Sequence, residues 1–182
     1  MLLLVVNKVL AVGTIAGQIF IVLGLIAFFL YRQDSGNRFL NFFGQHGLLL
    51  AWLMSVVATA SSLFYSEFAG FEPCFLCWWQ RIFMYPQVVL LGLALWRKDW
   101  RIADYGLPLA VLGAVISLYH NYLYYGGSSI VRCDAFGRGV SCLRLYIFEF
   151  SYVTLPLMAL TGFILVVFLL GLQHWYNRRS IS

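Results

Sequence analysis

The chain has 182 residues, of which 62% are hydrophobic, 18% are aromatic and only 10% are charged. A soluble domain carries about 45–50% apolar and about 25% charged residues, so this composition excludes soluble globular, disordered and fibrous proteins. The formal net charge is +5, but the basic residues form no run longer than two, which argues against a nucleic-acid partner. We therefore expect an all-α integral membrane protein whose surroundings are membrane lipid.

Five apolar stretches of the chain are long enough to cross a bilayer, which requires about 20 apolar residues each. They predict membrane-spanning helices at 9–31, 48–66, 78–96, 106–125 and 152–174. The first stretch exceeds the usual apolar core of a signal peptide and has only Lys8 before it, so we expect it to be retained. The remaining residues are too few for a second folded domain.

The basic residues predict the orientation of these helices. Seven of the twelve Lys and Arg residues lie in the connectors 32–47 and 97–105 and in the C-terminal tail, against four on the opposite side. An excess of basic residues marks cytoplasmic loops. We therefore expect the N-terminus outside and the C-terminus inside, with the loops 67–77 and 126–151 facing out of the cytoplasm.

All four cysteines lie in the two outer loops, Cys74 and Cys77 in the first and Cys133 and Cys142 in the second. Disulfides persist in oxidising compartments, and four cysteines allow three pairings. Proximity along the chain favours Cys74–Cys77 and Cys133–Cys142. Because a C-x-x-C disulfide closes a very small ring, it stabilises a fold little, and this spacing predicts a redox-active couple.

The C-x-x-C pair lies at the predicted start of the third helix, which we place at about Cys77. The positive end of a helix and its unpaired N–H groups lower the pKa of a nearby thiol. Arg81, one turn beyond Cys77, adds a positive charge on the same face, and Gln80 is a second polar candidate beside it. His120, among tyrosines near the outer end of the fourth helix, is either functional or part of an interfacial aromatic belt.

Other interpretations of the cysteines remain open. One is a zinc site with four thiolates, although the C-x8-C spacing of the second pair is unusual for zinc, and we expect no metal. Another is a non-catalytic membrane scaffold or helper subunit with structural disulfides. A third is a reductant-transfer protein that passes electrons in the reverse direction.

A disulfide that oxidises partners has to be re-oxidised, so electrons must leave the C-x-x-C pair. The sequence contains no haem-attachment motif, nucleotide-binding fingerprint or metal-cluster motif. With these acceptors excluded, we expect an apolar, aromatic membrane protein to pass the electrons to a lipid quinone.

Several motifs resemble one known family. The run Glu72–Pro86 (EPCFLCWWQRIFMYP) looks like the first outer-loop motif of the DsbB/BdbC disulfide bond formation proteins. The segment Gly139–Cys142 and the Leu155-Pro156 pair resemble their second loop and last helix, in the shorter BdbC style. His120, after an Ile-Ser-Leu-Tyr run, also matches, and the resemblance covers about 48–177.

This resemblance implies a four-helix transmembrane bundle at 48–177, carrying the redox loops 67–77 and 126–151, in a bacterial cytoplasmic membrane. Residues 1–47 are then an additional N-terminal transmembrane helix with a cytoplasmic connector, and 178–182 form a cytoplasmic tail. The extra helix is where this chain departs from the family pattern.

The resemblance also implies a function: re-oxidation of a soluble thioredoxin-like partner of the DsbA or BdbD type, with two electrons passed to bound ubiquinone or menaquinone. It implies that Cys133 exchanges with the partner, that Cys142 resolves the exchange toward Cys74, and that Cys77 is the thiol next to the quinone. The residues expected to contact the quinone are Cys77, Gln80, Arg81 and His120.

Overall fold

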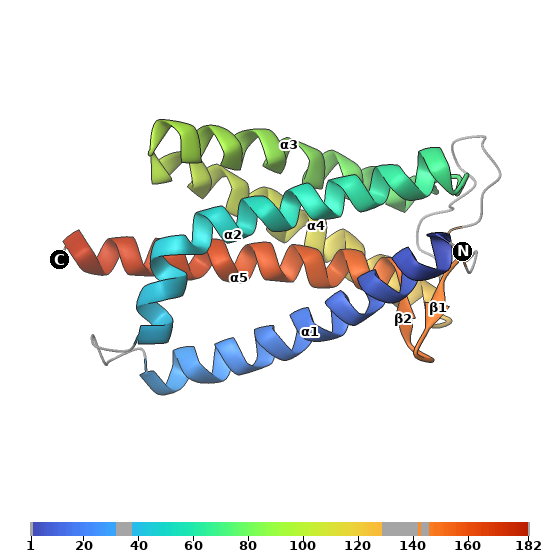
Figure 1. Ribbon diagram of the computed structural model, residues 1–182, viewed down its shortest axis with the longest axis horizontal. Coiled ribbons are helices and arrows are strands. Elements are labelled where there is room, and N and C mark those ends of the chain that lie inside the picture. The colour runs from blue at the N-terminus through green and yellow to red at the C-terminus, as the bar shows by residue number, and fades with distance from the viewer. Residues whose placement is uncertain (1, 32–37, 129–141, 143–145, 182) are drawn as a thin grey trace.

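The computed structural model describes residues 2–31, 38–128, 142 and 146–181. Within these residues five long helices lie alongside one another (Figure 1). The helices are α1 (Leu2–Tyr31), α2 (Arg38–Leu63), α3 (Phe75–Arg97), α4 (Ala103–Tyr124) and α5 (Leu155–Ile181). A π-helix, Phe64–Phe68, continues α2, and a short 3-10 helix, Trp100–Ile102, precedes α4. Two short antiparallel strands, β1 (Phe148–Glu149) and β2 (Val153–Thr154), lead into α5.

The all-α membrane fold expected from composition is confirmed. Among the described residues, four helical segments are long and apolar enough to cross a bilayer: Leu2–Tyr31, Leu40–Phe68, Trp100–Tyr124 and Leu155–Arg179. Helix α3 has 23 residues, about 34 Å of helix, but its polar side chains make it less apolar than the others. The protein is therefore a multi-pass membrane protein.

Several helices extend beyond the stretches predicted for them. Helix α2 begins at Arg38 rather than at residue 48, so only 32–37 connect it to α1. The prediction ended the helix where polar residues begin, but these side chains find partners in the bundle. Gln45 Nε2 donates to the Tyr176 hydroxyl at 3.1 Å, and His46 Nδ1 lies 3.0 Å from the Phe42 carbonyl one turn away.

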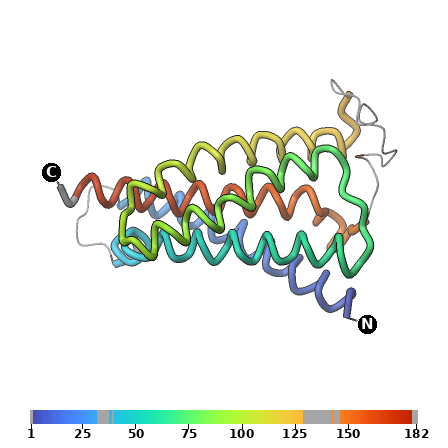
Figure 2. The backbone as a smooth tube through the Cα atoms, turned by 90° about the horizontal axis from the view of Figure 1, so that it is seen from above, coloured from blue at the N-terminus to red at the C-terminus, as the bar shows by residue number. Residues whose placement is uncertain are grey.

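Helix α5 lies at the centre of the bundle, where it packs against α2 and α4, and α3 completes the group (Figures 1 and 2). Its buried residues Phe163, Val166, Leu169 and Leu170 belong to the main apolar core. Small residues allow helix backbones to approach closely in membranes. A Cβ atom on Gly47 of α2 would lie 2.7 Å from the Leu169 backbone oxygen, so α2 and α5 meet backbone to backbone there.

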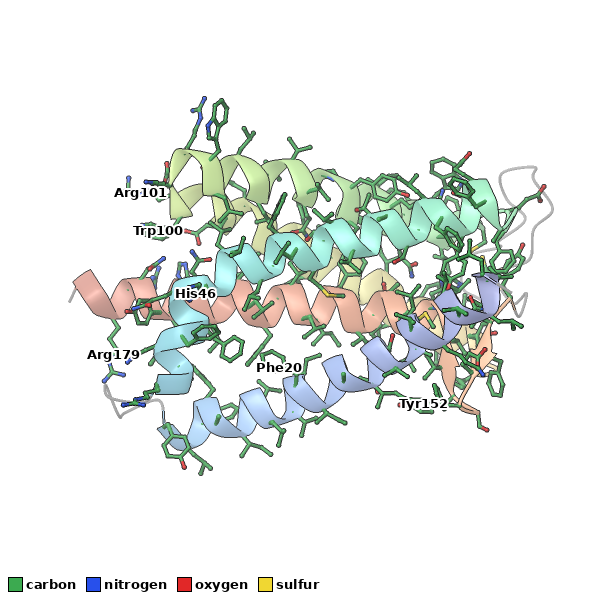
Figure 3. The ribbon with its side chains drawn as sticks, in the orientation of Figure 1. Phe20, His46, Trp100, Arg101, Tyr152 and Arg179 are labelled. Atoms are coloured by element: carbon green, nitrogen blue, oxygen red, sulfur yellow. The ribbon has the colours of Figure 1, made fainter. Side chains whose placement is uncertain are left out.

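Helix α1 also packs on α5. A Cβ atom on Gly17 would lie 3.0 Å from the Leu165 side chain, and one on Gly24 would overlap the ring of Phe168. Phe20 points from α1 into the bundle (Figure 3), where its ring centroid lies 6.0 Å from that of Phe168. Helix α1 is therefore an integral part of the bundle.

The two ends of the bundle differ in character. His46, Trp100, Arg101 and Arg179 lie at one end, and Tyr152 lies at the other (Figure 3). Helix α3 begins at the Tyr152 end (Figure 1), so the C-x-x-C pair lies far from these basic residues.

We predict that Gly47→Ala destabilises the protein by about 1–3 kcal/mol, because the added methyl group meets a backbone oxygen that cannot rotate away. Thermal unfolding in detergent measures this change. Gly171→Ala on α5 is the control, because its Cβ would meet nothing within 4 Å. An unchanged Gly47→Ala protein would contradict the close α2–α5 contact.

Candidate active site

Cys74 is the N-cap residue of α3. Its backbone is extended, with φ −70° and ψ 172°, and its sulfur accepts a hydrogen bond from the backbone N–H of Cys77 at 3.4 Å. The helix therefore begins at Phe75, so the predicted start at about Cys77 was wrong. The sulfur of Cys74 caps the helix as an oxygen of Ser or Asp would, and hydropathy does not reveal such a cap.

The two sulfur atoms of the pair lie 2.8 Å apart, and both residues are free thiols. The predicted disulfide is therefore not formed in this structure, although the thiols are close enough to form one. With His120, their potential ligand atoms lie within 4.8 Å of one another. Two thiolates on tetrahedral zinc would be about 3.8 Å apart, so the sulfur spacing favours a redox pair over a metal site.

His120 of α4 is buried, at 3% exposure, and joins three parts of the chain. Its Nε2 lies 3.2 Å from the backbone oxygen of Cys142 and 3.8 Å from Cys74 Sγ. Because a carbonyl only accepts, we assign the ring proton to Nε2. Nδ1 then accepts from the Gln80 amide at 3.3 Å. Helix α3, helix α4 and the second loop therefore meet at His120.

The pKa of the Cys74 thiol is lowered from its ordinary value of 9.0 to about 5. The largest cause is the hydrogen bond from the Cys77 thiol, and burial opposes it by disfavouring the charged form. The hydrogen bond from His120 lowers the pKa further, and the Cys77 backbone N–H adds a smaller effect. Above pH 5, Cys74 is therefore a thiolate in the reduced protein.

Cys142 packs against this site from the second loop. It is disulfide-bonded, is 3% exposed and belongs to the same apolar cluster as Cys74, Leu76 and Leu123. A cavity of about 30 Å³ lies between Cys74, His120 and Cys142. Cys133, the partner predicted for Cys142, lies outside the described residues.

A larger cavity of about 400 Å³ adjoins the small one, and Cys77 and His120 line both. Cys77 lines the larger cavity together with Gln80 and Arg81 of α3 and with His120, whereas Cys74 is not among its lining residues. Most of the remaining lining is apolar and comes from α1, α2, α3 and α5. The structure thus brings together the four residues expected to contact a quinone.

The guanidinium of Arg81 is held in a fixed position. Its Nε donates to Ser62 Oγ at 3.0 Å, its Nη2 donates to the Ser62 backbone oxygen at 3.1 Å, and the group lies 5.4 Å from the Trp78 ring centroid. The Tyr85 hydroxyl also donates to Ser62 Oγ, at 3.3 Å. Sequence reasoning missed Ser62 and Tyr85, because a serine on a face of small residues indicates helix packing.

Comparison with known proteins identifies the family. The family model for disulfide bond formation protein DsbB matches residues 44–170. The chain belongs to the DsbB family. The function of the family, disulfide bond formation, is thiol–disulfide oxidation at a membrane. This reaction requires two closely spaced thiols, which the chain has in Cys74 and Cys77. Helix α1 lies outside the DsbB match.

Individual relatives agree with the DsbB assignment. The probable disulfide formation protein C of Bacillus cereus is 50% identical over 122 residues, which are 67% of this chain and 87% of the relative. Disulfide bond formation protein C of Bacillus subtilis is 43% identical over 66% of this chain and 86% of its own length. A probable disulfide formation protein of Chlamydia pneumoniae is 42% identical over 76% and 98%, respectively. No solved structure matches the chain significantly.

We predict that Cys74 in the reduced protein titrates with a midpoint near pH 5, so that it is a thiolate at pH 7 and becomes protonated below pH 5. Ultraviolet absorbance of the thiolate, taken as the difference from the Cys74→Ser variant, follows this titration. His120→Ala should raise the midpoint, because a hydrogen bond to the thiolate is lost. His174→Ala is the control, because His174 lies near the end of α5 that is far from the thiol pair. A midpoint near 9 in the wild type would contradict the site geometry.

Proposed function

We propose that this protein re-oxidises a soluble thioredoxin-like partner of the DsbA or BdbD type outside the cytoplasm and passes two electrons to a membrane quinone. The observation that carries the proposal is the position of the two thiols. Cys77 lines the large cavity. Cys74 lies near Cys142 instead, and the Nε2 atom of His120 contacts both the Cys74 sulfur and the Cys142 backbone oxygen. Electrons can thus be received at Cys74 and released at Cys77, the thiol of the pair that lines the large cavity.

The proposed exchange balances in two stages. The Cys133–Cys142 disulfide first oxidises the partner's dithiol, taking up two electrons and two protons. The Cys142 thiolate then attacks Cys74 of the oxidised C-x-x-C pair, which releases Cys77 as a thiolate. Attack by Cys133 on Cys142 re-forms the second disulfide and releases Cys74. The C-x-x-C pair now holds the two electrons that came from the partner.

The chemistry of the large cavity fits a quinone. Its volume of about 400 Å³ lies within the range of small-molecule pockets, and a few polar groups converge at one end of an apolar lining. A bound quinone supplies a two-electron, two-proton acceptor. Gln80, Arg81 and His120 are the residues that would hold its polar ring beside Cys77.

Arg81 is suited to bind a carbonyl oxygen. A guanidinium has five N–H donors in a fixed plane, so a group that donates to Ser62 through Nε and Nη2 can still donate through its other nitrogen. Ser62 thus positions Arg81, and Arg81 orients the acceptor.

The environment of Cys74 favours the transfer of electrons from the partner's thiols to the C-x-x-C pair. A thiolate stabilised in the reduced state makes a couple more oxidising. The lowered pKa of the Cys74 thiol favours the reduced pair and so raises its potential. A reductant-transfer protein needs the opposite, a pair with a low potential.

The proposed orientation uses the two different ends of the bundle. Arg101 and Arg179 lie at the end opposite the cysteines (Figure 3), and basic residues prefer the cytoplasmic side. The cysteine end then faces the exterior of a bacterial cytoplasmic membrane, with the N-terminus outside and the C-terminus inside.

We predict that the protein in quinone-containing liposomes re-oxidises a reduced DsbA-like protein, and that extraction of the quinone abolishes turnover. Cys74→Ser and Cys77→Ser should each abolish it too, because neither variant can form the C-x-x-C disulfide. The rate of partner oxidation is measured by thiol titration. The same rate with and without quinone would sink the proposal.

A control separates this function from that of a scaffold with structural disulfides. A reduced partner whose second active-site cysteine is replaced by serine should accumulate a mixed disulfide with Cys133, because its thiolate displaces Cys142 from the Cys133–Cys142 disulfide and no second thiol can then release it. Non-reducing electrophoresis and mass spectrometry detect it. Cysteines that all stay oxidised during partner turnover would instead support the scaffold.

We also predict that His120→Ala makes the Cys74–Cys77 couple more reducing, because the Cys74 thiolate loses a hydrogen bond. Equilibration with glutathione buffers, followed by mass spectrometry of trapped thiols, measures the potential. His174→Ala should leave the potential unchanged. A higher potential in the His120→Ala variant would contradict the role assigned to this residue.

A further inference from the structure

The large cavity is elongated along the bundle. Along α2 and the π-helix that continues it, the lining extends from Met54 to Tyr65, twelve residues that rise about 16 Å. Cys77, Arg81 and Glu72 line it toward the cysteine end, whereas the lining farther along is apolar. Its shape and polarity therefore match a polar ring that carries an apolar tail.

Helix α1 provides one wall of this cavity. Val9, Leu10, Gly13 and Thr14 line it, although the whole of α1 lies outside the family match, which begins at residue 44. Because α1 and α2 are antiparallel, residues 9–14 of α1 face the part of α2 that precedes Tyr65 (Figure 1). This wall therefore extends from the level of the polar groups into the apolar part.

Polar contacts hold this part of α1 on both sides. At one side Asn7, which is buried, accepts a hydrogen bond from the Tyr65 hydroxyl at 2.8 Å. At the other, Gln18 donates to Thr161 Oγ1 at 3.3 Å and accepts from the Tyr152 hydroxyl at 3.2 Å. The wall is thus tied to the π-helix, to α5 and to the turn between the strands.

The surface that α1 presents to the cavity is apolar and has room. The Thr14 hydroxyl donates to the Leu10 backbone oxygen at 2.8 Å, so its polar group is already satisfied within the helix. Gly13 is exposed, and a Cβ atom there would meet nothing within 4 Å, so this position leaves open space at the outer edge of the cavity. A larger side chain there would occupy that space without disturbing the packing of α1.

We infer that α1 determines which quinones bind: Val9, Leu10 and Thr14 contact the isoprenoid tail, and Gly13 leaves the space that the tail occupies. This inference rests on the proposed function, because it concerns the tail of the same quinone. The ring lies against Cys77 and Arg81, and the tail extends along α1 toward the lipid.

The experiment compares the binding of two probes to the full-length protein in detergent: a ubiquinone ring without a tail, and the same ring with a tail of two isoprene units. Dissociation constants come from the thermal stabilisation of the protein at increasing probe concentration. Gly13→Leu should weaken binding of the tailed probe by about tenfold, because the side chain fills the space of the tail. Binding of the tail-free ring should stay unchanged.

Gly171→Leu is the matched control, because its Cβ is equally unobstructed but it does not line the cavity. A second pair keeps the test decisive if Gly13→Leu does not fold. Leu10→Ala removes apolar contact with the tail and should weaken only the tailed probe. Val12→Ala should change neither, because Val12 does not line the cavity.

The outcomes separate the two proposals. Equal affinities of wild type and α1 variants for the tailed probe, or equal weakening of both probes, would overturn the role of α1 and leave the quinone proposal intact. A wild-type protein that binds neither probe would overturn the proposed function and this inference together.

Discussion

The hydrogen bond from the Cys77 backbone N–H to Cys74 Sγ decides how the rest of the site is arranged. It makes Cys74 the cap of α3, outside the helical turn, and makes Cys77 part of that turn. Residues three or four apart share a helix face, so Cys77 carries Arg81 with it toward the large cavity. Cys74 stays at the helix end, where His120 and Cys142 meet it.

Polar groups in an apolar bundle need partners, and His120 satisfies several at once. It joins Gln80 on one side to the Cys142 carbonyl on the other, and its Nε2 also faces the Cys74 sulfur. Cys142 is thereby held against Cys74, which is buried, whereas Cys77 is partly exposed. The same contact helps to keep Cys74 charged, so loop docking and thiol reactivity depend on one side chain.

Apolar stretches predicted the five helices because lipid demands long runs of apolar side chains. Their ends were less predictable, because residues such as Gln45 find partners on helices distant in sequence. In the site, spacing alone placed Cys77 one turn from Cys74 and Arg81 one turn beyond Cys77. The contacts of Gln80 with His120 and of Arg81 with Ser62 depend on how α2, α3 and α4 pack. A local sequence pattern does not predict such packing.

Helix α1 shows how an addition to a family fold can acquire a specific position. In lipid the hydrophobic effect does not drive helices together, so association depends on close packing and on hydrogen bonds between them. Gly17 and Gly24 let α1 approach α5, while Asn7 and Gln18 bond to residues of the family core. These contacts fix how α1 is rotated about its own axis. In this rotation Val9, Leu10, Gly13 and Thr14 line the cavity. The catalytic pair and its polar neighbours thus belong to the family core, whereas part of the apolar wall comes from outside it.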